Sequence, residues 1–208
     1  ERIVDENDVQ SYTLCIVEDP ENANLLFLGT DDGLYISLNA GEKWTKWTEG
    51  FPTVPVKDLV IQERENDLII GTFGRSAWIL DDIRPLRKLA ATKGEQNKFF
   101  VSVPNAIHNL SIKNSPYEWS TWGMWDAPNK PTGLPISVNV TDSTKKVKVQ
   151  IKDMKDQVIR NLTFKVDSGL NRNYWGFEQK GKRAAGAPKT GGGGGRRFFD
   201  EEGGAAAN

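Results

Sequence analysis

The chain has 208 residues, which is enough for one large domain or two small ones. Its net charge of −1 argues against a nucleic-acid partner. One cysteine and one histidine exclude an intrachain disulfide and any zinc site built on several cysteines or histidines, so we expect no metal and no cofactor. No apolar run reaches the ~18 residues that a membrane-spanning helix needs.

The charges divide the chain into two parts. Residues 1–90 contain 9 Lys and Arg against 17 Asp and Glu, whereas residues 91–208 contain 18 against 11. Such an asymmetry is typical of two different structural units. The acidic and the basic half are therefore expected to fold separately.

An internal repeat organises the acidic half. The run at residues 25–30 returns at residues 67–72, an offset of 42 residues, and each copy lies between two further apolar runs. The runs are short, rich in Val, Ile, Leu and aromatics, and bounded by Asp, Asn, Gly or Pro, which indicates β-strands. Three or four strands per ~40–45 residues are typical of β-propeller blades. The pattern predicts two consecutive blades over residues 12–82, with no helix, the second lacking its outermost strand.

A distinctive turn sequence follows the third run of the first copy. It resembles the Asp-box, or BNR, motif Ser-x-Asp-x-Gly-x-Thr-Trp, with Ser37, Asn39, Gly41 and Trp44 at the motif positions. A short polar side chain at Asn39 can bond back to its own turn, Gly41 permits a positive φ, and Trp44 packs inward. These roles are structural rather than catalytic. Trp44 and Trp78, which follow matching strands, are both expected to be mostly buried.

Residues 51–56 and 71–86 extend the resemblance. Together they are similar to the closing blades of a bacterial family of secreted propellers, related to the sortilin ectodomain and commonly labelled BNR-repeat glycosyl hydrolases. The resemblance covers about residues 12–90 and implies a secreted, periplasmic or cell-surface bacterial protein. Members usually carry His where this chain has Phe73, so the resemblance transfers no acid–base role to that position.

Strand-like runs also mark the basic half, at residues 134–140, 146–152, 158–166 and 169–175. Charged and apolar residues alternate in the second run, which is typical of a sheet with one face in water. Residues 149–175 resemble the small immunoglobulin-like module that follows the propeller in the same family and occurs in flagellar hook-cap proteins. About four of the roughly seven strands of such a sandwich are visible.

The sequence thus predicts an all-β protein with the last two blades of a β-propeller, a partial immunoglobulin-like β-sandwich and a Gly-rich tail. The expected divisions are residues 1–90 for the blades, 91–131 for a linker with a Trp-rich loop, 132–178 for the sandwich and 179–208 for a loop or disordered tail. Incomplete domains leave open sheet edges that are prone to adding strands. We therefore expect a segment of a longer polypeptide, or one that completes a partner chain, with covering strands beside residues 74–80 and 158–175.

Four aromatic residues fall within nine positions of the linker: Tyr117, Trp119, Trp122 and Trp125. They could form a stacking platform for sugars or a partner segment, or fill the junction between the two units. Arg75 could clamp a carboxylate substrate, as in sialidases, but those enzymes use three converging arginines. Arg75 alone is more consistent with an ion pair to a carboxylate at residues 81–82.

Two adjacent carboxylate pairs, at residues 31–32 and 81–82, are the nearest approach to a glycosidase site. Neighbouring side chains on a strand point to opposite faces, so neither pair can supply both an acid and a base. Turn formation and backbone hydrogen bonds explain them better. Cys15 lies in an apolar run and is expected to be a buried thiol. No residue is assigned as catalytic.

Two functions from different classes compete. The first is a non-catalytic interaction module of a secreted or cell-envelope propeller protein, which binds a glycan or protein through the propeller face or the Trp-rich loop. The alternative is part of a glycan-acting hydrolase whose active site lies mostly in blades outside this chain. The Asp-box is a folding motif, so the family label is no evidence of catalysis. A third, weaker hypothesis is a subunit of a cell-envelope assembly.

Overall fold

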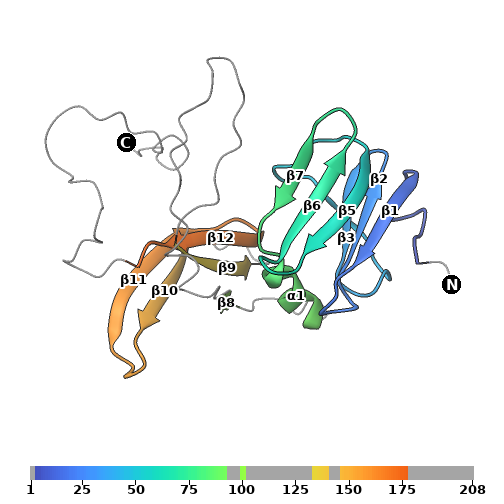
Figure 1. Ribbon diagram of the computed structural model, residues 1–208. Coiled ribbons are helices and arrows are strands. Elements are labelled where there is room, and N and C mark those ends of the chain that lie inside the picture. The colour runs from blue at the N-terminus through green and yellow to red at the C-terminus, as the bar shows by residue number, and fades with distance from the viewer. Residues whose placement is uncertain (1–2, 93–98, 102–132, 141–145, 178–208) are drawn as a thin grey trace, which may run out of the picture.

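The computed structural model describes residues 3–92, 99–101, 133–140 and 146–177 and shows a mostly β chain in antiparallel sheets (Figure 1). This confirms the all-β prediction at the level of fold class. The sheets form two units, one within residues 3–92 and the other within the remaining described residues.

Seven strands make up the first unit: β1 (Thr13–Glu18), β2 (Leu26–Thr30), β3 (Gly33–Ser37), β4 (Thr45–Trp47), β5 (Val56–Gln62), β6 (Asp67–Thr72) and β7 (Ala77–Leu80). Strands β1 to β4 form a four-stranded sheet in chain order, and β5 to β7 form a three-stranded sheet. Residues 12–82, all of which are described, contain no helix, as predicted. The repeat therefore builds two similar sheets, the second with one strand fewer.

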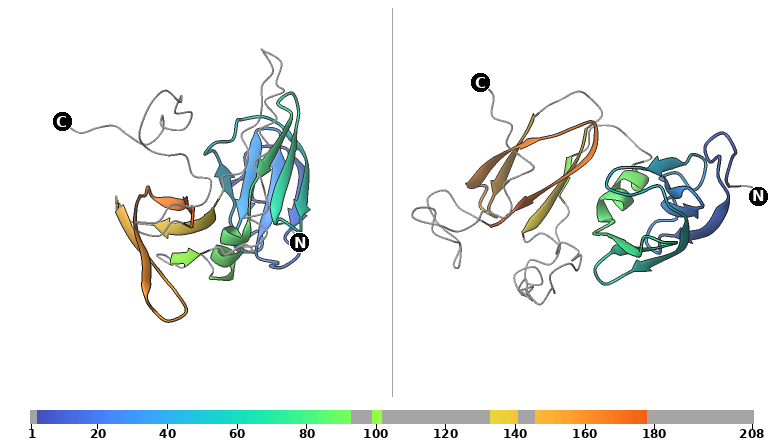
Figure 2. Two further views of the ribbon diagram at one scale, coloured as in Figure 1. Left: turned by 60° about the vertical axis from the view of Figure 1, so that its left-hand side comes forward. Right: turned by 90° about the horizontal axis from the view of Figure 1, so that it is seen from above.

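The main core lies between these two sheets and is closed at one end by helix α1 (Arg84–Ala91) (Figures 1 and 2). Alternate residues of each strand point into it, because the pleat directs successive side chains to opposite faces. Its buried members are Leu25, Phe27, Leu34, Ile36, Val56, Leu59, Leu68, Ile70, Ile83, Leu86, Leu89 and Ala90.

Helix α1 is absent from the sequence-based prediction. It has eight residues, about two turns, which is too short for a hydrophobic period to stand out. Pro85 lies in its first turn, where a missing N–H costs no helical hydrogen bond. The helix buries Leu86 and Leu89 against the sheets and lies on the side of the first unit that faces the second (Figure 2).

The two tryptophans of the repeat differ in burial. Trp44 is 4% exposed, which confirms the prediction for that residue. Trp78 is half-buried, so the two tryptophans are not buried to the same degree. Trp78 lies on β7, an edge strand, where its ring meets Phe51 edge-on and its indole N–H donates to the carbonyl of Arg75 (3.0 Å). No strand among the described residues covers its other side.

The second unit consists of β8 (Phe99–Val101), β9 (Leu134–Val140), β10 (Lys146–Lys152), β11 (Val158–Lys165) and β12 (Gly169–Trp175). They form a three-stranded sheet in the order β12–β9–β8 and the two-stranded hairpin β10–β11. Strands β9, β10 and β12 match the predicted runs, and β11 ends one residue earlier than its run. Strand β8 lies within the expected linker yet pairs with β9, so the second unit takes a strand from that range.

Candidate binding cleft between the two units

The Asp-box-like turn between β3 and β4 has the geometry that its sequence predicts. The buried Ser37 hydroxyl donates to Asn39 Oδ1 (3.0 Å) and accepts the N–H of Gly41 (2.9 Å). Asn39 Oδ1 also accepts the N–H of Lys43 (3.0 Å), and Gly41 has a φ of +89°. The polar side chains at the motif positions are thus engaged by the turn itself.

Trp44 anchors the segment that precedes β1. Its indole N–H donates to the carbonyl of Ile3 (2.8 Å), and its backbone N–H donates to Asp8 Oδ2 (3.0 Å). Val9 from the same segment packs with Trp44 in a second apolar cluster. The outer face of the first sheet is therefore partly covered by residues that lie before its first strand.

A cleft of about 430 Å³ lies beside this turn, between the two units. Strands β3 and β4 and helix α1 form one wall, and β9 and β12 contribute to the other. Its lining is mostly apolar: Ile36, Leu38, Trp47, Leu86, Leu89 and Leu170, with Asn39, Lys43, Thr45, Lys46, Asn139 and Gly169. Ligand sites in proteins are commonly apolar clefts of this size between domains, with a few polar groups at the rim.

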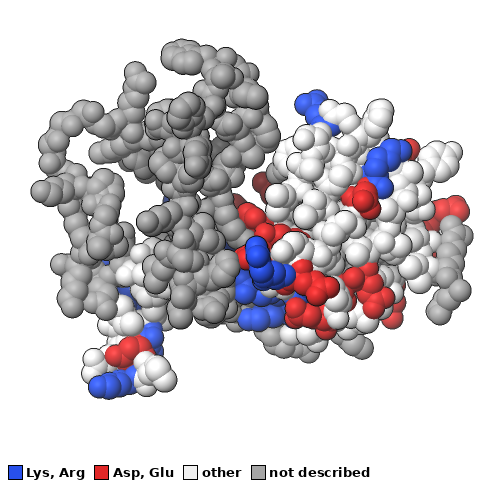
Figure 3. Space-filling model, viewed as in Figure 1, with Lys and Arg blue, Asp and Glu red and all other residues white. Residues whose placement is uncertain are grey.

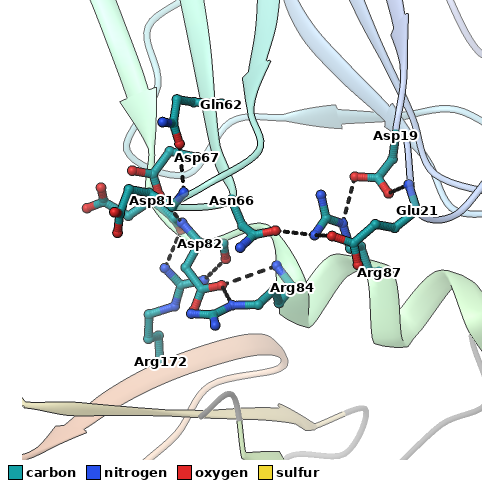
Figure 4. Close-up of polar contacts among 11 residues, drawn as sticks. Asp19, Glu21, Gln62, Asn66, Asp67, Asp81, Asp82, Arg84, Arg87 and Arg172 are labelled. Carbon is teal, nitrogen blue, oxygen red and sulfur yellow. Dashed lines mark hydrogen bonds and ion pairs between the residues drawn. The ribbon is translucent and has the colours of Figure 1, made fainter. Parts of the chain in front are cut away.

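Arg172 on β12 joins the two units (Figure 4). Its Nη1 donates to the carbonyl of Asp81 (2.5 Å) and its Nη2 to the carbonyl of Asp82 (2.6 Å). Leu170, two residues earlier on the same face of β12, packs against the core of the first unit. One strand face therefore both attaches the second unit and lines the cleft.

The predicted ion pair of Arg75 with Asp81 or Asp82 is wrong. Arg75 is exposed and forms no ion pair with a described residue, whereas Arg84 Nε lies 2.5 Å from Asp82 Oδ1 (Figure 4). Asp82 is 2% exposed, has a φ of +50°, and donates its N–H to Asp67 Oδ1 (2.8 Å). The Asp81–Asp82 pair thus serves a structural turn before α1, which agrees with its predicted role.

A buried ion pair ties α1 to the loops of both sheets (Figure 4). Arg87 is 7% exposed, and its Nε lies 2.7 Å from the fully buried Asp19 carboxylate. Its Nη1 donates to Glu21 (2.6 Å) and to the side-chain carbonyl of Asn66. Asp19 follows β1 and Asn66 precedes β6, so the helix links the first sheet to the second.

The Asp31–Asp32 pair also has a structural role. Asp31 Oδ1 accepts the N–H of Tyr12 (3.1 Å) and Ser11 donates to the same oxygen, while Asp32 lies 2.7 Å from Lys46 Nζ. Burial opposes ionisation of Asp32, but hydrogen bonds, led by that of Lys46, outweigh it and lower the pKa of that carboxyl. Both carboxylates are therefore engaged by their own sheet.

Cys15 is half-buried rather than fully buried. Its thiol lies 3.7 Å from the carbonyl of Val56, at the contact between β1 and β5. Burial, opposed in part by a hydrogen bond with the backbone of Gly29, raises the pKa of this thiol. A protonated, sheltered thiol is a weak nucleophile, which is consistent with a packing role.

The predicted aromatic platform of Tyr117, Trp119, Trp122 and Trp125 lies outside the described residues. Neither Leu170, which lines the cleft, nor Arg172 was identified from sequence, because each gains its role only by contact with the first unit; the two carbonyls that Arg172 binds precede it by about 90 positions. Of the predicted site residues that the structure describes, Asn39 alone lines the cleft.

Acidic side chains are concentrated on one part of the surface of the first unit (Figure 3). In the view of Figure 3, Asp and Glu side chains gather on the first unit toward the end that carries α1.

Among the described residues, no group of three or more His, Cys, Asp or Glu side chains could hold a metal ion. Within the same residues, no helix is long and apolar enough to cross a membrane.

Comparison with protein families, with curated proteins and with solved structures finds no match to this chain.

Proposed function

We propose that the chain is a non-catalytic interaction module of a secreted or cell-envelope bacterial β-propeller protein of the BNR-repeat, sortilin-like kind. In this proposal the sheets of the first unit are consecutive blades, the second unit is an immunoglobulin-like module, and the cleft between them contacts a glycan or protein ligand. The carboxylates of Asp31, Asp32 and Asp82 make structural hydrogen bonds or ion pairs, which favours this function over a glycan-acting hydrolase.

The proposal rests on a sheet face that occurs in both copies of the repeat. On the first sheet this face is covered by the second sheet, whereas on the second sheet it is exposed. On the first sheet, Phe27 and Ile36 are paired, and both are buried against the second sheet. The equivalent pair on the second sheet is Ile69 and Ile79, and Ile79 is 62% exposed. Val60, opposite Ile69, is 50% exposed.

A glycine at the same repeat position shows what covers this face. A Cβ atom on Gly29 would lie 2.5 Å from Cys15 Sγ, 2.7 Å from Val56 Cγ1 and 2.9 Å from the Val56 carbonyl oxygen, because β5 packs closely there. The three atoms nearest to a Cβ on Gly71, 42 residues later, all belong to Asp58 and lie 3.5 Å or more away. The glycine at position 71 is explained if a third sheet packs closely against the second sheet there. The second sheet packs against the first in the same way at Gly29. Such stacking, continued radially, is how a propeller is built.

Paired glycine substitutions test the stacking. We expect Gly29→Ala to destabilise the chain by about 1–3 kcal/mol through overpacking. Gly71→Ala is expected to be neutral or slightly stabilising, because glycine weakens a strand interior. Urea denaturation of the two variants measures both effects. Equal destabilisation by the two substitutions would show that Gly71 is already covered within this chain and would contradict the proposal.

Lysine substitutions on the exposed apolar face of the second sheet test directly whether this face associates with another surface. Val60, Ile69, Gly71 and Ile79 define this face, and exposed apolar sheet surfaces promote association. We expect the wild-type chain to self-associate as its concentration rises, and the variant Val60→Lys/Ile79→Lys to sediment as a monomer with its melting temperature retained.

A matched variant, Tyr12→Lys/Met154→Lys, adds the same charge at exposed apolar residues away from the open face. It should still self-associate as the wild type does. Unfolding of the Val60→Lys/Ile79→Lys variant, or equal sedimentation of all three proteins, would refute an open docking face.

A further inference from the structure

The hairpin β10–β11 has two chemically different faces. Alternation places Val147, Val149, Leu162 and Phe164 toward the core of the second unit. The opposite face is exposed and carries Lys146, Lys148, Gln150, Asn161, Thr163 and Lys165. Because β10 and β11 belong to neither sheet of the first unit, this surface is independent of the stacking proposed above.

Three lysines concentrate positive charge at one end of the exposed face. Lys146 lies directly opposite Lys165, and Lys148 follows two residues along the same face. The Cβ atoms of opposite residues lie ~5 Å apart and those of alternate residues ~7 Å apart, so the three lysine side chains start within one Debye length of each other, about 8 Å at physiological ionic strength. None of the three forms an ion pair with a residue that the structure describes, whereas Lys152 is paired with Asp156 (3.1 Å).

Like charges placed opposite each other on a sheet destabilise it. Lysines on edge strands also hinder strand addition, but that role does not require them to be opposite one another. Their clustering without acidic partners among the described residues is explained by an anionic partner that neutralises them in the complex.

The other side chains on this exposed face indicate which class of anionic partner fits it. Next to the lysines lie amide and hydroxyl groups, with Gln150 Nε2 donating to Asn161 Oδ1 (3.1 Å). The exposed face of the hairpin has no aromatic ring, since Phe164 points to the opposite side. Single-stranded nucleic acids depend on stacking against aromatic side chains. A flat array of ammonium, amide and hydroxyl groups suits a chain of oxyanions and hydroxyls.

We propose that Lys146, Lys148 and Lys165 form a binding surface for a linear anionic polysaccharide, whose carboxylate or sulfate groups they neutralise. The neighbouring amides and Thr163 hydrogen-bond the sugar hydroxyls. The interaction is electrostatic at its centre, so its affinity falls as salt rises.

The experiment measures binding of the full chain to immobilised heparin, polygalacturonate, neutral dextran and a single-stranded oligonucleotide over a series of salt concentrations. We expect heparin or polygalacturonate, or both, to bind, and dextran not to bind. The first two probes separate sulfate from carboxylate recognition. The variant Lys146→Gln/Lys148→Gln/Lys165→Gln should bind the anionic glycans at least tenfold more weakly and lose about 2–3 from the slope of log affinity against log salt.

Two control variants make the result specific. Lys57→Gln/Arg64→Gln/Lys155→Gln removes the same charge from other exposed positions and should change affinity less than twofold, while Lys→Arg at the three proposed residues should retain binding. A glutamine variant that keeps both its melting temperature and its glycan affinity would overturn the proposal. So would equal or tighter binding of the oligonucleotide, which would indicate a nucleic-acid surface. Aggregation of that variant with glycan affinity unchanged would assign the lysines to protection of the edge strands.

Discussion

Trp44→Ala is expected to lower the free energy of unfolding by about 3–5 kcal/mol, the range for large buried aromatics. The side chain is 4% exposed and packs with Leu28 and Tyr35 on the outer face of the first sheet. Its loss leaves a cavity and removes the donor to the Ile3 carbonyl, which releases the segment before β1. Urea denaturation followed by circular dichroism measures the change.

Trp47→Ala is the matched control, since Trp47 lies three residues later and is only half-buried. Its indole N–H donates to the nearby Glu49 carbonyl (2.8 Å), a local contact. We expect less than half the loss caused by Trp44→Ala. Similar losses for both variants would mean that Trp44 has no special role in holding the turn and the segment before β1.

Arg87→Ala is expected to cost a similar 3–5 kcal/mol, because it leaves the carboxylate of Asp19 buried without its cation. Asp19 is 1% exposed, and its other oxygen accepts the N–H groups of Glu21 and Asn22 (2.9 Å each), so it cannot turn toward water. The loss should appear in the urea midpoint and in weaker attachment of α1. Arg64→Ala removes a cation that is 77% exposed and should change stability by less than about 0.5 kcal/mol.

A double variant separates the stability lost with the Arg87–Asp19 charge pair from the stability lost with the packing of the Arg87 side chain. Asp19→Asn keeps an oxygen for the two turn N–H groups but has no charge to compensate. In that background Arg87→Ala should cost clearly less than it does alone, and the difference measures the coupling of the pair. An Arg87→Ala loss that is the same in both backgrounds would assign the effect to lost packing of the arginine stem.

The strands and the turn chemistry follow from local sequence patterns. Alternating apolar residues fix the backbone locally in residues 134–140 and 146–152, which form strands as predicted, and the predicted run at residues 169–175 is also a strand. The hydrogen bonds of Ser37 and Asn39 span at most four residues and follow from spacing alone. The 42-residue repeat likewise yields two similar sheets, because equal local patterns give equal strands.

Which faces meet and which side chains come together depends on the tertiary structure. Trp44 and Trp78 follow matching strands, yet Trp44 is buried and Trp78 only half-buried, because burial depends on what packs from elsewhere in the chain. Arg84 rather than Arg75 reaches Asp82, and helix α1 is too short to show a period. The contact between the two units includes Arg172, whose partners precede it by about 90 residues. Such contacts are set by the path of the whole chain, which no local pattern records.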